Sequence, residues 1–154
     1  MCNVVYKLAS KAIANRLKKI LPSIISDTQS AFMHRRLITD NVFVTFKTMH
    51  HINMKKGGRK GEMVLKLDMS KAYDRVEWGC LDKIMDKLGF EGRWRKLLLT
   101  CISIVTYFVR NNGKPHGHIV PSRGLRQGNP LSLYLFLLYA ESLSALIKKG
   151  VGDG

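Results

Sequence analysis

The stretch that decides the fold of this chain is Met63–Trp78, MVLKLDMSKAYDRVEW. Its first five residues, Met63–Leu67, are apolar apart from one lysine, which predicts a short buried strand. Asp68 follows at the carboxyl end of that strand, and Tyr73 comes five residues later. An aspartate at a strand end is most often a cap or a turn residue. The aromatic ring at this spacing instead favours a site in which a metal-bound nucleotide lies between a carboxylate and a flat ring.

A helix is predicted directly after this unit, because apolar residues recur at helical spacing up to Gly89. These apolar positions are Trp78, Leu81, Met85 and Leu88. Asp82 and Asp86 share another face of this helix, and a solvated or salt-bridged face explains them better than metal ligation does. A further helix is predicted over Arg93–Ile102. Its buried residues would be Trp94, Leu97, Leu98 and Cys101.

The composition is that of one folded domain with a strongly basic front. The chain has 154 residues, 45% of them hydrophobic, and a formal net charge of +15 at pH 7. The first 60 residues carry twelve Lys and Arg against only two acids, Asp27 and Asp40. Solvated lysine faces are common, but a charge excess of this size favours a polyphosphate partner such as a nucleic acid.

The three cysteines are widely spaced and odd in number, so a disulfide framework is not indicated and a reducing compartment is expected. No run of eighteen apolar residues occurs, so no membrane partner is expected. The basic opening segment has some features of a mitochondrial transit peptide, but the strict register of its apolar residues favours a helix of the fold. We therefore expect an intracellular protein, cytoplasmic or nuclear.

Two helices are predicted in the front part of the chain. The first covers Asn3–Leu21 and is expected to end at Pro22. Its apolar positions are Val5, Leu8, Ala12, Ile13, Leu17, Ile20 and Leu21. The second begins at a cap, Thr39 or Asp40, and precedes a basic loop at Lys55–Gly61. Its shared apolar face would contain Val42, Phe46 and Met49.

A β-hairpin is predicted next, with one strand at Ile104–Arg110, a turn at Asn111–Gly113 and a return strand at His118–Val120. His116 and His118 would lie on one face, which is occasionally a metal-binding spacing. Zinc is disfavoured here, because no paired cysteines or further histidines lie nearby.

The second informative stretch is Pro121–Phe136, PSRGLRQGNPLSLYLF. Asn129 and Pro130 are well suited to the cap and the first position of a buried, leucine-rich helix. Its buried leucines would include Leu131, Leu135 and Leu138. The loop before the helix offers backbone N–H groups and the side chains of Arg123, Arg126 and Gln127, a corner that could read an anion and a sugar.

Nearly the whole chain, residues 3–149, resembles the reverse transcriptase region of plant LINE-type (non-LTR) retrotransposons. The resemblance is carried by NVVYKLASKAIANRL, QSAF, RLITDN, LKLDMSKAYDRVEW, KLGF and SRGLRQGNPLS. It implies an α+β fold, a partial right hand in which helices pack on a small antiparallel sheet. Residues 1–61 would be partial fingers and residues 62–154 an incomplete palm with interleaved fingers elements, without a thumb.

The resemblance also implies roles for particular residues. Asp68 would be the catalytic ligand of two magnesium ions, helped by the carbonyl of Met69. Tyr73 would be an aromatic gate that clashes with a ribose 2′-OH and so selects deoxynucleotides. The incoming nucleotide would also meet Arg126, Gln127 and Gly128. Template contacts would come from Arg36, Arg123, Pro130 and Ser132.

The implied partners are an RNA template, a DNA primer and deoxynucleoside triphosphates. The family's second acid motif, an aromatic-Ala-Asp-Asp turn, has no counterpart here, and the chain contains no adjacent pair of acids. Two-metal nucleotidyl transfer needs several carboxylates. We therefore expect a truncated polymerase fragment that is inactive alone. The alternatives are a non-catalytic basic nucleic-acid-binding module and a non-functional product of a decayed element.

The chain departs from the family pattern in three places. Asn129 stands where an acid is usual, and Leu133 stands where proline is usual. His34 and Arg35 replace a Pro-Gly pair, so a turn that favoured glycine now carries a cationic side chain.

Overall fold

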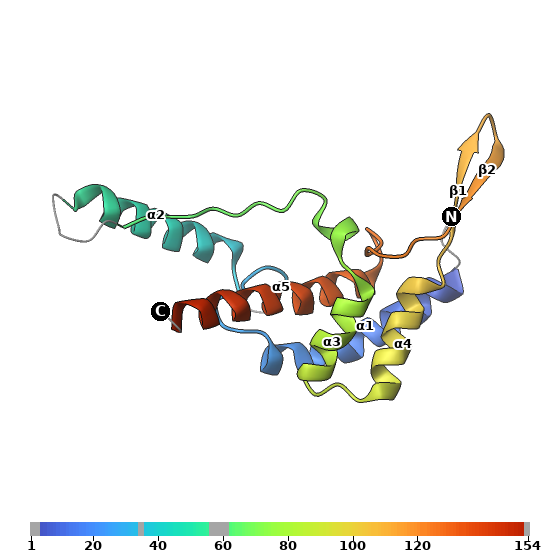
Figure 1. The fold of residues 1–154 in the computed structure, drawn as a ribbon, viewed down its shortest axis with the longest axis horizontal. Coiled ribbons are helices and arrows are strands. Elements are labelled where there is room, and N and C mark those ends of the chain that lie inside the picture. Colours follow the sequence, from blue (N-terminus) through green and yellow to red (C-terminus); the bar gives the residue numbers. More distant parts are fainter. Residues whose placement is uncertain (1–3, 34–35, 56–61, 153–154) are drawn as a thin grey trace. The chain divides into compact units, whose positions relative to one another are not determined.

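The computed structural model describes residues 4–33, 36–55 and 62–152, and this part is mostly helical with one small sheet (Figure 1). Its elements are α1 (Val4–Ile24), α2 (Ile38–Met54), the 3₁₀ turn η1 (Ala72–Arg75), α3 (Trp78–Lys87), α4 (Gly92–Ser103), β1 (Tyr107–Asn111), β2 (Lys114–Ile119) and α5 (Pro130–Gly152). Helices accompanied by a small antiparallel sheet confirm the expected fold class at this coarse level.

The chain forms two compact units, and each is described by itself. The first contains residues 1–25 and 71–154, and the second contains residues 26–70. The predicted loop at Lys55–Gly61 lies outside the described residues except for Lys55, and the pair His34 and Arg35 lies outside them altogether.

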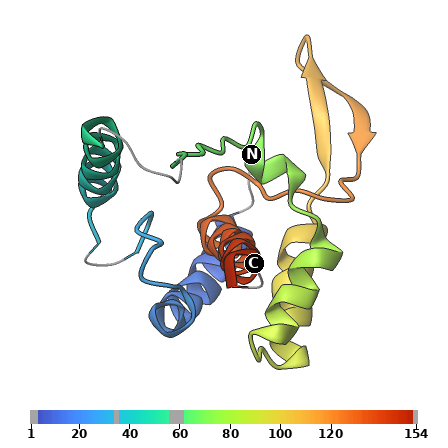
Figure 2. The same cartoon turned by 60° about the vertical axis from the view of Figure 1, so that its left-hand side comes forward.

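The core of the first unit is built around α5. Helix α5 packs on α1 and on α3, and α3 packs in turn on α4. Figure 2 looks roughly along α5 and shows α1 beside it. The fully buried apolar side chains of this core include Leu17, Leu21, Leu81, Met85, Leu98, Leu131, Leu135 and Leu138. The predictions that α3 and α5 bury an apolar face are therefore confirmed.

Helix α3 ends as the sequence predicts. Gly89 has a φ of +82°. Its N–H donates to the carbonyl of Asp86, and the N–H of Phe90 donates to the carbonyl of Met85, both at 3.0 Å. This pair of bonds is a Schellman motif, which a left-handed glycine makes at low cost.

Helix α1 differs from the prediction in its end and in its buried face. It runs through Pro22 to Ile24, because the proline lies in the last turn and removes only one intrahelical donor. The next turn is still closed by the N–H of Ile25, which donates to the carbonyl of Leu21 at 2.9 Å. The buried positions are Ser10, Ala14, Leu17 and Leu21. Val5 and Leu8, expected on the apolar face, are exposed.

Helix α4 buries Leu98 as predicted, with Ile102 as its second buried residue. Trp94 and Cys101 are half-buried. Leu97 was predicted to be buried but is 44% exposed.

The hairpin is confirmed, with a two-residue turn at Asn112 and Gly113, whose φ angles are +46° and +81°. Strand β2 begins earlier than predicted, at Lys114. The register shifts between Phe108 and Val109, which pair with His118 and His116 respectively. Neighbouring residues of β1 point to opposite faces, so the two histidines do as well. The prediction that they share a face is wrong, because Gly117 is inserted as a bulge.

In the second unit, Met63–Leu67 is not a strand. The segment is exposed, with Met63 at 85% and Leu65 at 70%. A strand needs a neighbour for its backbone groups. The one strand pair in the described part of the chain is β1 with β2, in the other unit. The prediction of a buried strand is therefore wrong for this structure.

Helix α2 begins slightly earlier than predicted. Leu37 is its cap residue, and the Asp40 side chain accepts a hydrogen bond from the N–H of Leu37 at 3.3 Å. None of its residues is buried, so the face containing Val42, Phe46 and Met49 is exposed.

By length and composition alone, α5 is also apolar enough to cross a bilayer, with a mean hydropathy of 1.5 over its most apolar 18-residue window. A core helix of a water-soluble domain meets the same criterion. Here the N-terminal half of α5 packs in the core through Leu131, Leu135 and Leu138, whereas Leu146 and Val151 near its end are exposed.

Candidate functional site

In the first unit, the end of the first stretch singled out in the sequence, residues 71–78, meets the loop of the second stretch. The N–H of Gly124 donates to the carbonyl of Val76 at 2.7 Å, and the N–H of Leu125 donates to the carbonyl of Tyr73 at 2.8 Å. Gly124 has a φ of +93°, and a Cβ atom there would lie 3.3 Å from the Cα of Asp74. Glycine is thus required by both the backbone conformation and the close approach.

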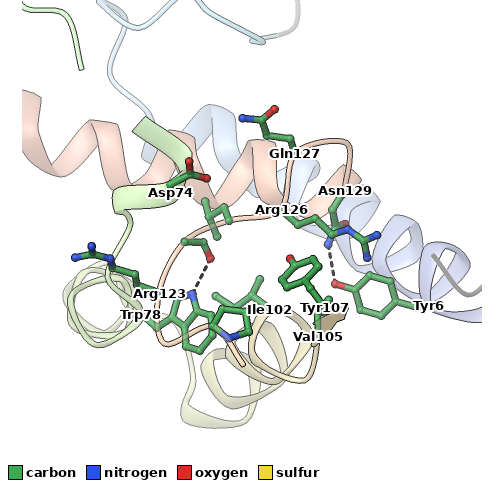
Figure 3. Close-up of a pocket in the computed structure, with 13 residues that line it drawn as sticks. Tyr6, Asp74, Trp78, Ile102, Val105, Tyr107, Arg123, Arg126, Gln127 and Asn129 are labelled. Carbon is green, nitrogen blue, oxygen red and sulfur yellow. Dashed lines mark hydrogen bonds between the residues drawn. The ribbon is translucent and has the colours of Figure 1, made fainter. Parts of the chain in front are cut away.

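The first part of the loop is also tied to α3. The indole Nε1 of Trp78, the first residue of α3, donates to the carbonyl oxygen of Gly124 at 2.8 Å (Figure 3). This bond and the two backbone bonds leave the 121–125 segment little freedom relative to η1.

The other end of the loop is held by Asn129. Its Oδ1 accepts a hydrogen bond from the N–H of Leu131 at 3.1 Å, which confirms the predicted cap of α5. Its Nδ2 donates to the hydroxyl oxygen of Tyr6 at 2.8 Å, and that hydroxyl donates to the carbonyl of Cys101 at 2.6 Å. The loop is therefore anchored to α1 and α4 as well as to α5.

A cavity of about 350 Å³ lies beside the anchored loop. Figure 3 shows three aromatic residues around it, Tyr6, Trp78 and Tyr107. Three charged residues also line it: Asp74, Arg123 and Arg126. The guanidinium carbon of Arg126 lies 5.9 Å from the ring centroid of Tyr107, a cation–π arrangement. Arginines beside aromatic rings suit a ligand that carries both phosphates and flat bases.

Sequence reasoning found the two arginines but not the roles of Tyr6, Asp74 and Tyr107. These three come from α1, η1 and β1, which lie far apart in the chain. No local pattern marks such residues. The one signal in the sequence was the position of Asp74 directly after the aromatic gate candidate Tyr73.

Tyr73 lies against α5. Its ring stacks on that of Phe136, with 4.7 Å between centroids and 14° between planes. Burial raises the pKa of the Tyr73 hydroxyl above its usual value of 10.0. The stack fixes the ring plane, whereas the role of the ring as a sugar gate remains a prediction.

The remaining predicted residues of the loop and of α5 have varied environments. Figure 3 shows the side chain of Gln127 directed away from the rings of Trp78 and Tyr107. Gly128 has a φ of +79° and open space where a Cβ would lie. Pro130 is the first residue of α5. Ser132 is 1% exposed, and its hydroxyl has no hydrogen-bond partner in the described part of the chain.

Three predicted residues belong to the second unit: Asp68, Met69 and Arg36. Asp68 and Met69 are exposed in the extended segment before residue 71. Arg36 is engaged locally. Its guanidinium donates to the carbonyl of Ser26 at 2.7 Å and to that of Gln29, and it pairs with Asp27 at 2.9 Å. These contacts hold the Arg36 side chain against residues 26–29, and the template role of Arg36 remains a prediction.

No three His, Cys, Asp or Glu side chains gather as possible metal ligands among residues 4–33, 36–55 and 62–152. A two-magnesium centre needs several converging carboxylates.

Comparison with known proteins gives one family match and several relatives. Residues 1–152 match the family model described as "Reverse transcriptase (RNA-dependent DNA polymerase)". An uncharacterized 149 kDa protein of transposon TX1 from Xenopus laevis is 33% identical over 146 residues, which is 94% of this chain and 11% of that protein.

Two other relatives match shorter stretches. A Pol polyprotein from the type-1 retrotransposable element R2 of Popillia japonica is 28% identical over 105 residues, 68% of this chain and 15% of that protein. An uncharacterized mitochondrial protein of Arabidopsis thaliana is 56% identical over 43 residues, 28% of this chain and 35% of that protein. The chain thus spans a small part of each relative's length.

Proposed function

The chain belongs to the reverse transcriptase (RNA-dependent DNA polymerase) family, and we propose that it forms the nucleotide- and template-binding corner of a non-LTR retrotransposon polymerase. Relatives that include a transposon TX1 protein and an R2 polyprotein support this element type. The proposal includes fingers elements over residues 1–61, palm elements with interleaved fingers elements over residues 62–154, and an intracellular place of action.

The observation that carries the proposal is the junction between η1 and the 123–129 loop. Two backbone hydrogen bonds and the Trp78 indole hold the loop against the turn that carries Tyr73. Arg123 and Arg126 lie on that loop beside an aromatic-lined cavity. Rigid placement of cations beside rings reduces the ordering cost of binding a nucleotide.

In this proposal each residue has a distinct task. Arg123 and Arg126 bind phosphate or template backbone, and guanidinium groups suit that task because of their paired donors. Gln127 and Gly128 lie against the incoming deoxynucleotide, and Tyr73 excludes a 2′-OH by steric contact. Pro130, Ser132 and Arg36 belong to the template side.

Asp68 and the carbonyl of Met69 are the proposed magnesium ligands. Magnesium held there would stabilise the charge on the attacking and leaving oxygens of nucleotidyl transfer, which takes further carboxylates. Since the described residues do not gather such a set, we propose that the chain by itself binds a primer–template but does not extend it.

The test combines binding and primer extension. Fluorescence anisotropy with an RNA template annealed to a DNA primer should show a dissociation constant that rises steeply with salt. The double variant Arg123→Gln/Arg126→Gln should weaken binding at least fivefold. The control Lys148→Gln/Lys149→Gln removes the same charge from the end of α5 and should change the dissociation constant by less than twofold.

Primer extension with magnesium and deoxynucleotides should yield no templated product. Templated synthesis that is lost in Asp68→Ala would refute the inactivity of the isolated chain while supporting the role of Asp68. Salt-dependent binding that is indifferent to Arg123→Gln/Arg126→Gln would favour the second candidate, a basic module that binds through its front segment, whose first 60 residues hold twelve Lys and Arg.

A further inference from the structure

A second groove lies between α1 and α4, away from the cavity beside the loop. Helix α1 packs mainly on α5, and α4 packs mainly on α3. The groove consists of two adjoining hollows of about 350 and 550 Å³. Arg16, Glu91 and Trp94 line both hollows.

The residues that line this groove include cations from both helices and the aromatic ring of Trp94. Arg16 comes from α1, whereas Arg93 and Lys96 come from α4, and all three are exposed. Trp94 is half-buried and lines both hollows. Glu91 is the one acid that lines either hollow. Apolar surface is also accessible nearby, because Ile20 is 43% and Leu97 is 44% exposed.

We propose that this groove binds single-stranded nucleic acid. The phosphates would be held by Arg16 on one wall and by Arg93 and Lys96 on the other, with one base against the indole of Trp94. A cationic groove with an aromatic stacking surface is the arrangement with which proteins hold single strands without sequence preference. The formal net charge of +15 favours a polyanion, and the indole of Trp94 favours one that carries flat bases over an acidic peptide.

This inference deepens the proposed function, because it gives the chain a second contact for a strand outside the primer–template duplex. It uses none of the residues assigned to the loop or the cavity. The groove and the proposed function can therefore fail separately.

In a duplex each base is stacked between its neighbours, so its faces are not accessible to an indole ring. Trp94 can therefore stack only on unpaired bases. Substitution of Trp94 should consequently separate single-stranded from double-stranded ligands. Substitution of the cations should weaken both, since phosphates are present in both. This contrast distinguishes base stacking from simple charge attraction.

The experiment measures anisotropy of a labelled oligouridylate and of a labelled RNA duplex of equal length, over a range of salt. Trp94→Leu should weaken binding of the single strand about tenfold and binding of the duplex less than twofold. Arg16→Gln/Lys96→Gln should reduce the slope of log K against log salt for the single strand by about 1.4. The matched control Lys148→Gln/Lys149→Gln should reduce it by less than about 0.5.

Urea denaturation of each variant checks that the fold persists, and Trp94→Phe supplies a second variant that keeps a flat ring. Trp94→Phe should retain binding within about threefold. The proposal would be overturned if Trp94→Leu weakened binding of the single strand and of the duplex equally. It would also be overturned if Arg16→Gln/Lys96→Gln and the control variant gave equal slopes of log K against log salt. Competition by polyglutamate as effective as unlabelled oligouridylate would also overturn it, in favour of an acidic polypeptide.

If Arg123→Gln/Arg126→Gln leaves primer–template binding unchanged while Trp94→Leu still weakens the single strand, the proposed function fails and the groove stands. If Arg123→Gln/Arg126→Gln weakens primer–template binding while Trp94→Leu leaves binding of the single strand unchanged, the proposal for the groove is refuted and the proposed function stands.

Discussion

Replacement of Gly124 by alanine tests the junction on which the site depends. The residue has a φ of +93°, and an added Cβ would lie 3.3 Å from both the Cα and the carbonyl oxygen of Asp74. Backbone strain at such a φ costs about 1 kcal/mol or more. Displacement of the loop would also weaken its hydrogen bonds to Val76 and Trp78, each worth about 0.5–1.5 kcal/mol. We therefore expect Gly124→Ala to lower the free energy of unfolding by about 2–4 kcal/mol.

The assay is urea denaturation followed by tryptophan fluorescence, which also reports on the Trp78 indole. The matched control is Gly89→Ala, where φ is +82° but no atom lies within 4 Å of the added Cβ. In this control the free energy of unfolding should fall by about 1 kcal/mol, the cost of the backbone conformation alone. Equal losses in the two variants would show that the close approach to Asp74 carries no energetic weight, and the reasoning would be refuted.

Three further predictions concern the core, the cap and the gate. Leu135 is 0% exposed, so Leu135→Ala should lower the free energy of unfolding in urea denaturation by about 2–5 kcal/mol. Leu146 is 67% exposed, so Leu146→Ala should change it by less than about 0.5 kcal/mol. Similar losses in the two variants would contradict the placement of the core. Asn129→Ala removes both the cap of α5 and the hydrogen-bond donor to Tyr6. This variant should lower the free energy of unfolding in the same assay by about 1–3 kcal/mol. An unchanged free energy of unfolding would contradict the anchoring of the loop. Burial raises the pKa of Tyr73 above 10.0, so the neutral phenol is favoured in the fold and its stabilisation is lost as the pH rises through the folded pKa. Burial also raises the pKa of Tyr139. Absorbance titration should thus show late-titrating tyrosines whose amplitude falls by one residue in Tyr73→Phe, and a fall in the amplitude of the ordinarily titrating tyrosines instead would contradict the burial of Tyr73.

Local sequence signals predicted several elements well. The cap at Asn129, the left-handed end of α3 at Gly89 and the hairpin turn at Asn112 each depend on a few neighbouring residues. Such features follow from backbone sterics and short-range hydrogen bonds, so the chain's other parts do not alter them.

Elements that depend on distant partners were predicted less well. Met63–Leu67 has the composition of a strand, but a strand also requires a neighbour, and its own unit offers none in the described residues. The buried face of α1 follows α5, which packs on it, rather than the apolar periodicity alone. A histidine spacing likewise could not reveal the bulge at Gly117.

The same limit applies to the site. The sequence indicated the loop that carries Arg126 and the turn that carries Tyr73. The anchoring of that loop by Tyr6 joins residues 123 positions apart, so no local pattern could have predicted it. The roles of Asp68 and Gln127 follow from family resemblance, and they await a direct test.

Photocrosslinking provides the most direct test of the central claim that the Tyr73 turn and the loop form one nucleic-acid-binding corner. The chain is irradiated with a primer–template that carries 4-thiothymidine at the primer end, and the crosslinked peptides are identified by mass spectrometry. We predict crosslinks to Tyr73 or to residues 123–128, and their loss in Arg123→Gln/Arg126→Gln. Crosslinks confined to the exposed end of α5, or spread over the chain without preference for this corner, would contradict the account.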